Sequence, residues 1–258
     1  MPVQKLSLNS SSSARHTLAI LSGKGGVGKS FVTSSLAVAL RRQGYRVGIL
    51  DADITGPSIP KAFGLTEAAL SDGKNMIPLE TETGIKVMSI NLILEDPSAA
   101  VLWRAPIVSN AIHQFYENVN WGDLDFLLVD MPPGTGDVAL TVFQSLNISG
   151  IVLVTTPQDL VELIVDKSYN MARQMNLPIL GLVENMSYFT CPHCGEQTDL
   201  YGPSKAASLA KKYGLEKTLP LPIDPNFSQK VDAGKVEEIQ VPGMDTFVLG
   251  MDWKFIGK

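Results

Sequence analysis

The segment at residues 22–30, SGKGGVGKS, constrains the fold of this 258-residue chain more than any other. An apolar run at residues 18–21 precedes it, and a helix-compatible segment, FVTSSLAVALRRQ, follows it. It satisfies the pattern G-x-x-x-x-G-K-[S/T] in the strand–loop–helix context that this pattern requires. Its glycines allow left-handed backbone angles, so N–H groups and the positive end of the next helix can converge on an anion. The sequence therefore predicts a nucleotide-phosphate site, against the alternative of a glycine-rich turn that binds nothing.

Each residue of this loop has an expected role in the site. Lys29 is expected to reach the β- and γ-phosphates, and it is therefore a candidate catalytic residue as well as a nucleotide ligand. The Ser30 hydroxyl is expected to bind Mg²⁺. The residues expected to surround the nucleotide are Gly25, Gly26, Val27, Gly28, Lys29, Ser30 and Phe31.

Carboxylates follow two further predicted strands. Asp130 ends the apolar run DFLLV, a Walker B pattern, and is expected to hold the Mg²⁺ that Ser30 also binds. Asp51 and Asp53 follow the run RVGIL two residues apart, so in extended chain they share a face. Asp53 is expected to stand beside the phosphates, where it would orient the hydrolytic water and contribute to the Mg²⁺ site. A turn residue followed by a cap is the structural alternative for this pair.

Apolar runs alternate with helix-compatible segments along the whole chain. Their continuous apolar character indicates parallel strands covered on both faces. We therefore predict an α/β fold with a doubly wound, mostly parallel sheet and helices on both faces. A flexible leader is expected at residues 1–16, a single domain at residues 17–258, and a loop at residues 186–202 that holds both cysteines. Strands are predicted at residues 17–21, 46–50, 85–90, 125–129, 150–155 and 178–184, and helices at residues 29–43, 58–63, 105–118, 160–174, 203–213 and from 226 onward.

Charge and composition exclude several classes of partner. The chain carries 21 basic and 26 acidic residues, and no basic block exceeds two adjacent residues, so no nucleic-acid partner is expected. No apolar run approaches the roughly 20 residues of a membrane span, so no membrane partner is expected either. Only two cysteines are present, which argues against a secreted disulfide scaffold and makes the cytoplasm the expected location.

The two cysteines form a CxxC sequence, Cys191-Pro192-His193-Cys194. By chemistry alone this loop is a dithiol redox pair, half of a zinc site, half of an iron–sulfur site or a structural thiol pair. Metal sites of either kind generally have four ligands, and His193 is poorly placed inside the CxxC to bind the same ion. Two chains, each giving Cys191 and Cys194, are the simplest way to reach four ligands. Zinc and a [4Fe–4S] cluster both stay open on ligand count.

The phosphate loop contains a second lysine, Lys24, which an ordinary loop of this kind does not need and which would otherwise be a solvated side chain. GKGGVGKS resembles the deviant Walker A sequence of the MinD/ParA/ArsA-like ATPases, whose signature lysine matches Lys24. This resemblance implies that two protomers face each other and that Lys24 acts catalytically on the partner's nucleotide. Hydrolysis would then depend on dimerisation.

A larger part of the chain resembles the Mrp/ApbC/Ind-type P-loop iron–sulfur carrier proteins. The matching segments are SGKGGVGKS, DADITGPSIP, DFLLVDMPPGTGD, TTPQD, VENMSYFTCPHCG and PIDP. The resemblance implies a MinD/ParA-like P-loop NTPase fold and a homodimeric ATPase that uses ATP and Mg²⁺. It implies a labile [4Fe–4S] cluster, bridged by Cys191 and Cys194 of both chains and passed to apo iron–sulfur client proteins. It also implies that Asn185 reads the adenine edge, with Pro222 and Asp224 nearby.

The chain departs from that family's pattern at Phe31, where the family usually has a second hydroxyl residue. A side-chain contact to phosphate is therefore lost, while backbone contacts survive.

Two other functions stay as alternatives: a MinD/ParA-like positioning or partition ATPase on membrane or DNA, and a zinc-bridged dimeric NTPase without cluster chemistry. The first predicts a basic amphipathic C-terminal helix, but the terminal sequence GMDTFVLGMDWKFIGK is weakly amphipathic at best. Metal analysis would separate the second.

Overall fold

The central strand of the fold is β1 (Ser13–Ser22), which leads directly into the phosphate-binding loop. Its last seven residues are buried, as expected for a strand covered on both faces. Side chains along β1 alternate between two apolar clusters, with Leu18 and Ile20 in one and Ala19 and Leu21 in the other. The computed structural model describes residues 5–53, 56–93, 105–158, 161–251 and 253 of the chain.

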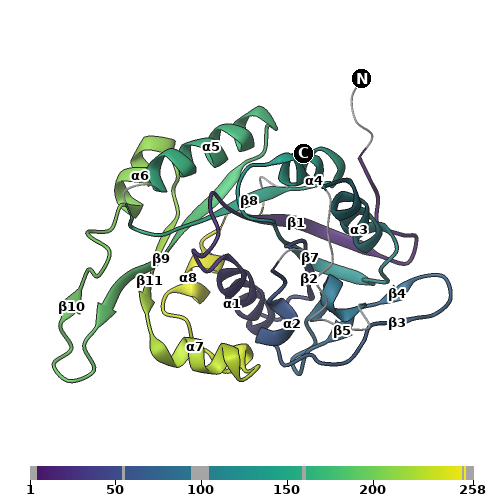
Figure 1. The fold of residues 1–258 in the computed structure, drawn as a ribbon, viewed down its shortest axis with the longest axis horizontal. Coiled ribbons are helices and arrows are strands. Elements are labelled where there is room, and N and C mark those ends of the chain that lie inside the picture. The colour runs from purple at the N-terminus through teal and green to yellow at the C-terminus, as the bar shows by residue number, and fades with distance from the viewer. Residues whose placement is uncertain (1–4, 54–55, 94–104, 159–160, 252, 254–258) are drawn as a thin grey trace.

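The main sheet is mostly parallel, which confirms the predicted α/β architecture (Figure 1). The other strands are β2 Val47–Asp51, β3 Leu70–Ser71, β4 Met76–Ile77, β5 Leu79–Glu80, β6 Lys86–Met88, β7 Asp123–Asp130, β8 Gly150–Thr155, β9 Ile179–Thr190, β10 Gln197–Thr198 and β11 Thr218–Ile223. Within the described residues the sheet order is β10–β9–β8–β1–β7–β2–β6–β5, and β11 also pairs with β9. β5 and β10 run antiparallel to their neighbours, and β3 and β4 form a separate hairpin. Because β1, β2 and β7 are parallel, their carboxyl ends meet at one edge of the sheet.

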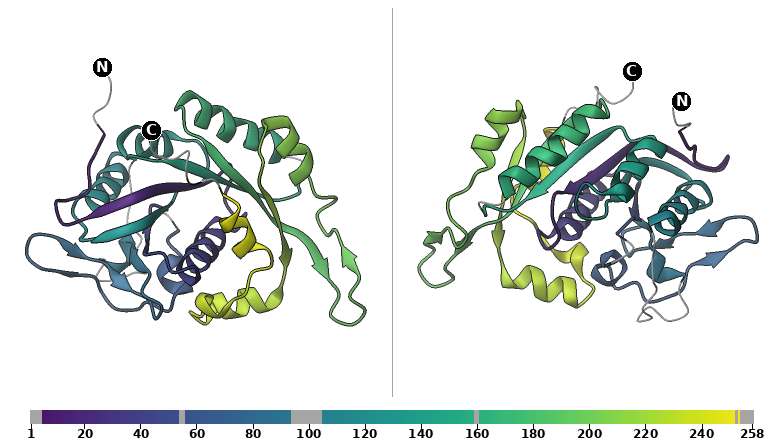
Figure 2. Two further views of the ribbon diagram at one scale, coloured as in Figure 1. Left: turned by 180° about the vertical axis from the view of Figure 1, so that it is seen from behind. Right: turned by 45° about the horizontal axis from the view of Figure 1, so that its top comes forward.

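Helices cover both faces of this sheet, as Figure 2 shows from two further directions. They are α1 Lys29–Arg42, α2 Ile59–Ala62, α3 Ala105–Glu117, α4 Asp137–Ser145, α5 Val161–Gln174, α6 Ala206–Tyr213, α7 Pro225–Asp232 and α8 Met244–Leu249, with short 3-10 turns η1 Ile90–Leu92 and η2 Val236–Glu238. One apolar cluster joins the sheet to α1, α2 and α8, and the second joins it to α3, α4, α5 and α6. The first residue of the helix predicted at residues 160–174 lies outside the described residues.

The N-terminal segment is bonded to the domain, contrary to the leader predicted at residues 1–16. Residues 13–16 already belong to β1. Lys5 Nζ donates to two carbonyl oxygens at the end of α4, at 2.6 and 2.8 Å, where a cation satisfies helix carbonyls that have no partner in the helix. Asn9 Nδ2 donates to a backbone carbonyl after α3 at 2.7 Å. Residues 5–16 are therefore linked to the domain by these bonds and by β1, and residues 1–4 lie outside the described residues.

Strand β9 continues well beyond the predicted strand at residues 178–184. Its pairing with β11 slips: Glu184 faces Pro220, but the next pairs resume at Tyr188. Met186, within this bulge, has φ of +58°, a left-handed conformation that is uncommon outside glycine. The strand then runs to Thr190 and pairs antiparallel with β10, so residues 186–190 of the predicted loop belong to a hairpin. This hairpin projects from the body of the molecule at the lower left of Figure 1.

The C-terminal segment, for which the sequence offered no usable pattern, completes one side of the core. Phe247 and Val248 of α8 are buried in the apolar cluster that also contains α1. The Phe247 ring lies so close to Gly181 of β9 that a Cβ at that glycine would come within 2.6 Å of it. In the described ranges, no helix has both the length and the apolar character needed to cross a membrane.

Candidate functional site

The phosphate-binding loop closes around the start of α1. Gly28 is the N-cap residue of α1 with φ of 80°, and Gly26 has φ of 79°, conformations that glycine adopts without strain. Space also requires glycine at position 28, because a Cβ there would come within 2.2 Å of Asn185 Nδ2. The loop lines a pocket of about 350 Å³, which we call the phosphate pocket. The predicted site residues that line it are Lys24, Gly25, Gly26, Gly28, Lys29, Ser30, Phe31 and Asp53.

Asp130, at the end of β7, is bonded to three side chains from the first turns of α1. Lys29 Nζ lies 2.9 Å from Asp130 Oδ2, and Ser30 Oγ donates to the same oxygen at 2.6 Å. Thr33 Oγ1 donates to Asp130 Oδ1 at 2.6 Å. Asp130 and Ser30 therefore lie together, as the Walker B pattern predicted. Carboxylate and hydroxyl oxygens are the donors that Mg²⁺ prefers, so this donor set fits that ion.

Asp53 and Asp51 occupy different environments. Asp53 lines the phosphate pocket, and its Oδ2 lies 3.8 Å from Lys29 Nζ. Asp51 is fully buried beside Asp130 of the neighbouring strand, and its Oδ2 accepts a hydrogen bond from Ser89 Oγ at 3.1 Å. Burial, together with repulsion from Asp130, raises the pKa of Asp51 to about 8. Asp53 is thus the carboxylate that lines the phosphate pocket, and Asp51 is buried in the sheet.

Lys24 lines the phosphate pocket, but its amine is bonded within its own chain. Lys24 Nζ donates to Oε1 of Gln158 at 2.5 Å. Gln158 follows β8 in the TTPQD segment, so the loops after β1 and β8 are joined at this point. The contact of Lys24 with a second chain stays a prediction.

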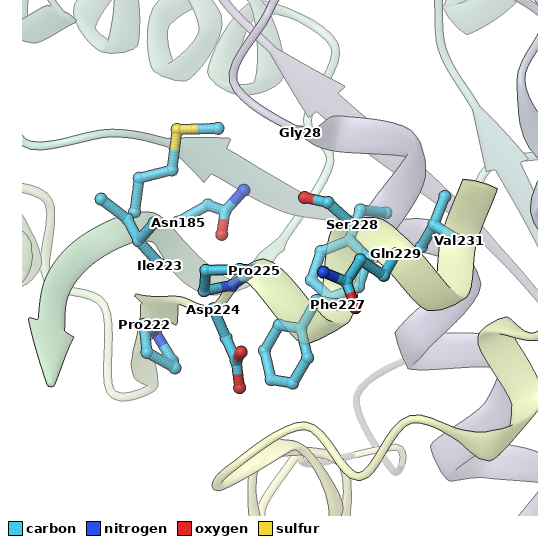
Figure 3. Close-up of a pocket in the computed structure, with 12 residues that line it drawn as sticks. Gly28, Asn185, Pro222, Ile223, Asp224, Pro225, Phe227, Ser228, Gln229 and Val231 are labelled. Atoms are coloured by element: carbon cyan, nitrogen blue, oxygen red, sulfur yellow. The ribbon is translucent and has the colours of Figure 1, made fainter. Parts of the chain in front are cut away.

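A second pocket, of about 640 Å³, adjoins the phosphate pocket, and we call it the base pocket (Figure 3). Gly28, Phe31 and Val231 line both pockets, so the two are continuous. Asn185 lines the base pocket, and its Nδ2 donates to the carbonyl of Val27 at 2.9 Å. This bond fixes the Asn185 amide against the phosphate loop, and Val27 contributes through its backbone.

The far wall of the base pocket is the segment that joins β11 to α7. Pro222 of β11 and Asp224 both line the pocket, and Figure 3 shows Asp224 next to Pro225 at the start of α7. Asp224 is also the N-cap residue of α7, because its carboxylate accepts from the backbone N–H of Asn226 at 2.8 Å. Asp224 therefore has a structural role at this wall whether or not a nucleotide is bound.

The hairpin of β9 and β10 carries both cysteines at its turn. Cys191 is half-buried and Cys194 is exposed, and both are free thiols. Cys191 N–H donates to the Glu196 carbonyl, and Gly195 N–H donates to the Cys191 carbonyl, each at 2.9 Å, which closes a tight turn. The backbone N–H groups of Cys194 and His193, together with the Cys194 thiol, lower the pKa of the Cys191 thiol. A lower pKa favours the thiolate, the form that binds metals.

Four residues that complete these sites were missed in the sequence: Thr33, Ser89, Gln158 and Phe227. Thr33 carried a signal, because it lies four residues after Lys29 and therefore on the same face of the helix. The other three come from segments far along the chain, and no local pattern indicates their contacts.

Known proteins with a similar sequence or fold identify the family to which this chain belongs. An iron-sulfur cluster carrier protein of Aquifex aeolicus is 44% identical over 230 residues; the match covers 88% of this chain and 63% of that protein's length, so the chain spans less than two thirds of this relative. The solved structure of a nucleotide-binding protein from Archaeoglobus fulgidus in complex with ADP is 45% identical, with a TM-score of 0.82 over 91% of this chain and 92% of that one. The cell division ATPase MinD of Pyrococcus furiosus is 22% identical with a TM-score of 0.62 over 91% and 95% of the two chains, and it shares the fold. A family of the ParA group, described as the NUBPL iron-transfer P-loop NTPase, matches residues 13–247. This chain belongs to the NUBPL iron-transfer P-loop NTPase family.

Proposed function

We propose that this chain is an ATP-hydrolysing iron–sulfur cluster carrier that works as a homodimer and passes a [4Fe–4S] cluster to apo-proteins. The observation that carries the proposal is the pair of free thiols, Cys191 and Cys194, on a projecting hairpin of a P-loop NTPase. In the part of the chain that the structure describes, no group of three or more His, Cys, Asp or Glu side chains could hold a metal ion. A [4Fe–4S] cluster takes four cysteine ligands, and two chains would supply that number.

The hairpin suits a cluster that is cargo. Cys191 has a lowered thiol pKa and Cys194 is exposed to solvent, so both sulfurs are open to ligand exchange. The cysteine thiolates of a client protein can approach such a cluster from the solvent side and replace the carrier's sulfurs one at a time. A cluster held by fully buried ligands would be shielded from that exchange.

The two pockets suit the hydrolysis of ATP. Lys29 and the N–H groups of the loop would hold the β- and γ-phosphates, and Asp53 would orient or deprotonate the attacking water. Mg²⁺ held by Ser30, Asp130 and Asp53 would neutralise charge on the phosphates when it is bound. Asn185 and the segment from Pro222 to Asp224 would hold the adenine end in the base pocket.

Lys24 links hydrolysis to dimerisation in this proposal. On the partner's nucleotide, the Lys24 ammonium would stabilise charge that develops on the phosphates in the transition state. The Lys24–Gln158 hydrogen bond, at 2.5 Å, must break before that contact can form. We therefore expect hydrolysis to be slow and to depend on the dimer.

The proposed partners are a second copy of this chain and apo iron–sulfur client proteins, with no nucleic acid and no membrane. The proposed location is the cytoplasm, where cysteines are kept reduced and available as ligands.

Anaerobic reconstitution with iron and sulfide tests the proposal. The wild-type chain should gain one [4Fe–4S] cluster per two chains, with the broad visible absorption of such a cluster, and should elute as a dimer. Cys191→Ala and Cys194→Ala should each abolish the cluster but retain ADP binding, and His193→Ala should retain both, since His193 is not an expected ligand. A wild-type dimer that holds zinc tightly and never a cluster would instead establish the zinc-bridged NTPase.

A further inference from the structure

Phe31 lies at the junction of the phosphate pocket and the base pocket, and the proposed chemistry does not use its side chain. It is the third residue of α1, directly after Lys29 and Ser30, and it lines both pockets. A phenyl ring has no hydrogen-bond donor to offer a phosphate oxygen. Its side chain must therefore act on another part of the nucleotide, or on the protein alone.

The Phe31 ring is stacked on Phe227 of α7, with ring centroids 5.6 Å apart and an interplanar angle of 26°. Val231 lies one turn after Phe227 on the same face of α7 and, like Phe31, lines both pockets. All three side chains pack partly buried against the apolar core. They therefore form one continuous apolar surface from the phosphate pocket into the base pocket, which we call the aromatic wall.

The distance between the two rings decides how a base can meet this wall. Inserting a base between the rings would need a separation of about 7 Å, which is two contacts of about 3.5 Å each. The rings are closer than that, so a base has to lie against the outer surface of the stacked pair. Pro222 and Ile223 of β11 and Pro225 at the start of α7 also line this pocket, and Figure 3 labels all three.

We propose that the aromatic wall of Phe31, Phe227 and Val231 binds the nucleoside end of a purine nucleotide and that the Phe31 side chain contributes to that end rather than to the phosphates. This inference rests on the proposed nucleotide site and adds the source of its affinity. A hydroxyl residue at position 31 would bind phosphate, whereas Phe31 exchanges that contact for apolar contact with sugar and base. The wall also joins the phosphate loop to α7, a helix with no fully buried residue of its own.

Two probes separate the two ends of the nucleotide: ADP, which uses both pockets, and inorganic pyrophosphate, which uses the phosphate pocket alone. Both are titrated calorimetrically into the full chain. Phe31→Ala should weaken ADP binding about tenfold, equal to about 1.4 kcal/mol, while pyrophosphate affinity stays within about twofold of wild type. Phe227→Ala should act in the same way, because its ring forms the other half of the wall.

Two further variants test whether a loss of binding comes from a loss of fold. Phe227→Leu retains apolar volume and removes the ring, so it should weaken ADP binding by less than Phe227→Ala. Leu249→Ser removes an apolar side chain of α8 that is 69% exposed, and it should bind both probes as the wild type does. The double variant Phe31→Ala/Phe227→Ala should lose less than the product of the two single effects, because the two rings share one contact.

Different results would refute the role of the aromatic wall and the proposed nucleotide site. If Phe31→Ala binds ADP as tightly as wild type, or loses pyrophosphate and ADP affinity equally, the aromatic wall has no role at the nucleoside end. If the wild-type chain binds neither pyrophosphate nor ADP, the nucleotide site itself is refuted.

Discussion

Substitution of Glu184 tests whether its hydrogen bonds hold the bulge of β9, which lies between the nucleotide side of the molecule and the cysteine hairpin. It is the last residue of β9 before the bulge, and its side chain is fully buried. Its Oε1 accepts a hydrogen bond from the backbone N–H of Lys205 at 2.8 Å, and its Oε2 lies 2.6 Å from Ser187 Oγ. The Ser187 hydroxyl also lies 2.8 Å from the backbone carbonyl of Glu184, which gives its proton a second acceptor.

Two substitutions of similar volume should differ in their cost. In Glu184→Gln, the amide oxygen can accept from Lys205 N–H, and the amide N–H can donate to Ser187 Oγ while that hydroxyl donates to the backbone carbonyl. The Lys205 N–H, the Ser187 hydroxyl and the backbone carbonyl all keep a partner, and only the second amide N–H is left without one among them, so we expect a smaller cost than for Glu184→Leu. In Glu184→Leu, the Lys205 N–H loses its acceptor, and we expect a cost of about 1–3 kcal/mol.

Urea denaturation followed by far-UV circular dichroism measures both free energies of unfolding. The exposed Glu82 gives the matched control, because Glu82→Leu makes the same chemical change at the surface and should stay within about 0.5 kcal/mol of wild type. If Glu184→Leu unfolds within that same range, or if Glu184→Gln is the more damaging change, the hydrogen bonds of Glu184 do not hold the bulge.

Three further predictions concern single contacts. Burial lowers the pKa of His16 in the folded chain, so as the pH drops below about 6.5 the unfolded chain binds the proton before the folded chain does and the free energy of unfolding should fall. His16→Phe should reduce this pH dependence when denaturation at pH 7.5 and pH 5.5 is compared. An equal dependence in the variant would contradict the prediction. Thr33→Val keeps the shape of the side chain but removes the hydroxyl bonded to Asp130, which should cost about 1.5–3 kcal/mol in urea denaturation; a neutral variant would show that this bond adds no stability. Gln158→Ala releases Lys24 and should raise the ATP hydrolysis rate about two- to tenfold in a phosphate-release assay; an unchanged rate would mean that the resting bond does not limit hydrolysis.

Much of the nucleotide site was predictable because its residues are adjacent in the sequence. The spacing of glycines, Lys29 and Ser30 fixes the loop, and the apolar strand before Asp130 places that carboxylate at the same sheet edge. The same logic gives the parallel sheet and most of its helices. The spacing of Asp51 and Asp53 predicts a shared face, but Asp53 lines the phosphate pocket while Asp51 is buried, and its raised pKa depends on neighbours from other strands.

The cysteine hairpin was not predictable in the same way. The sequence predicts that this strand ends at Glu184. Met186, which follows, adopts a left-handed backbone conformation that its residue type does not indicate. The two residues of β10 become a strand only by pairing with the end of β9, so no propensity marks them. The packing of α8 on the core is likewise a contact between distant segments, and the segment's length and composition did not indicate it.

The slip between β9 and β11 sets a rule for how this chain can tolerate insertions and deletions. Between the pairs at Glu184 and Tyr188, β9 has three residues where β11 has one, a surplus of two. Since side chains alternate along a strand, an even surplus returns the chain to the same alternation. Deleting one residue here would make the surplus odd and turn the later side chains, with both thiols, to the opposite side of the sheet. Deleting two would restore the alternation but draw the thiols back toward the body by about 7 Å.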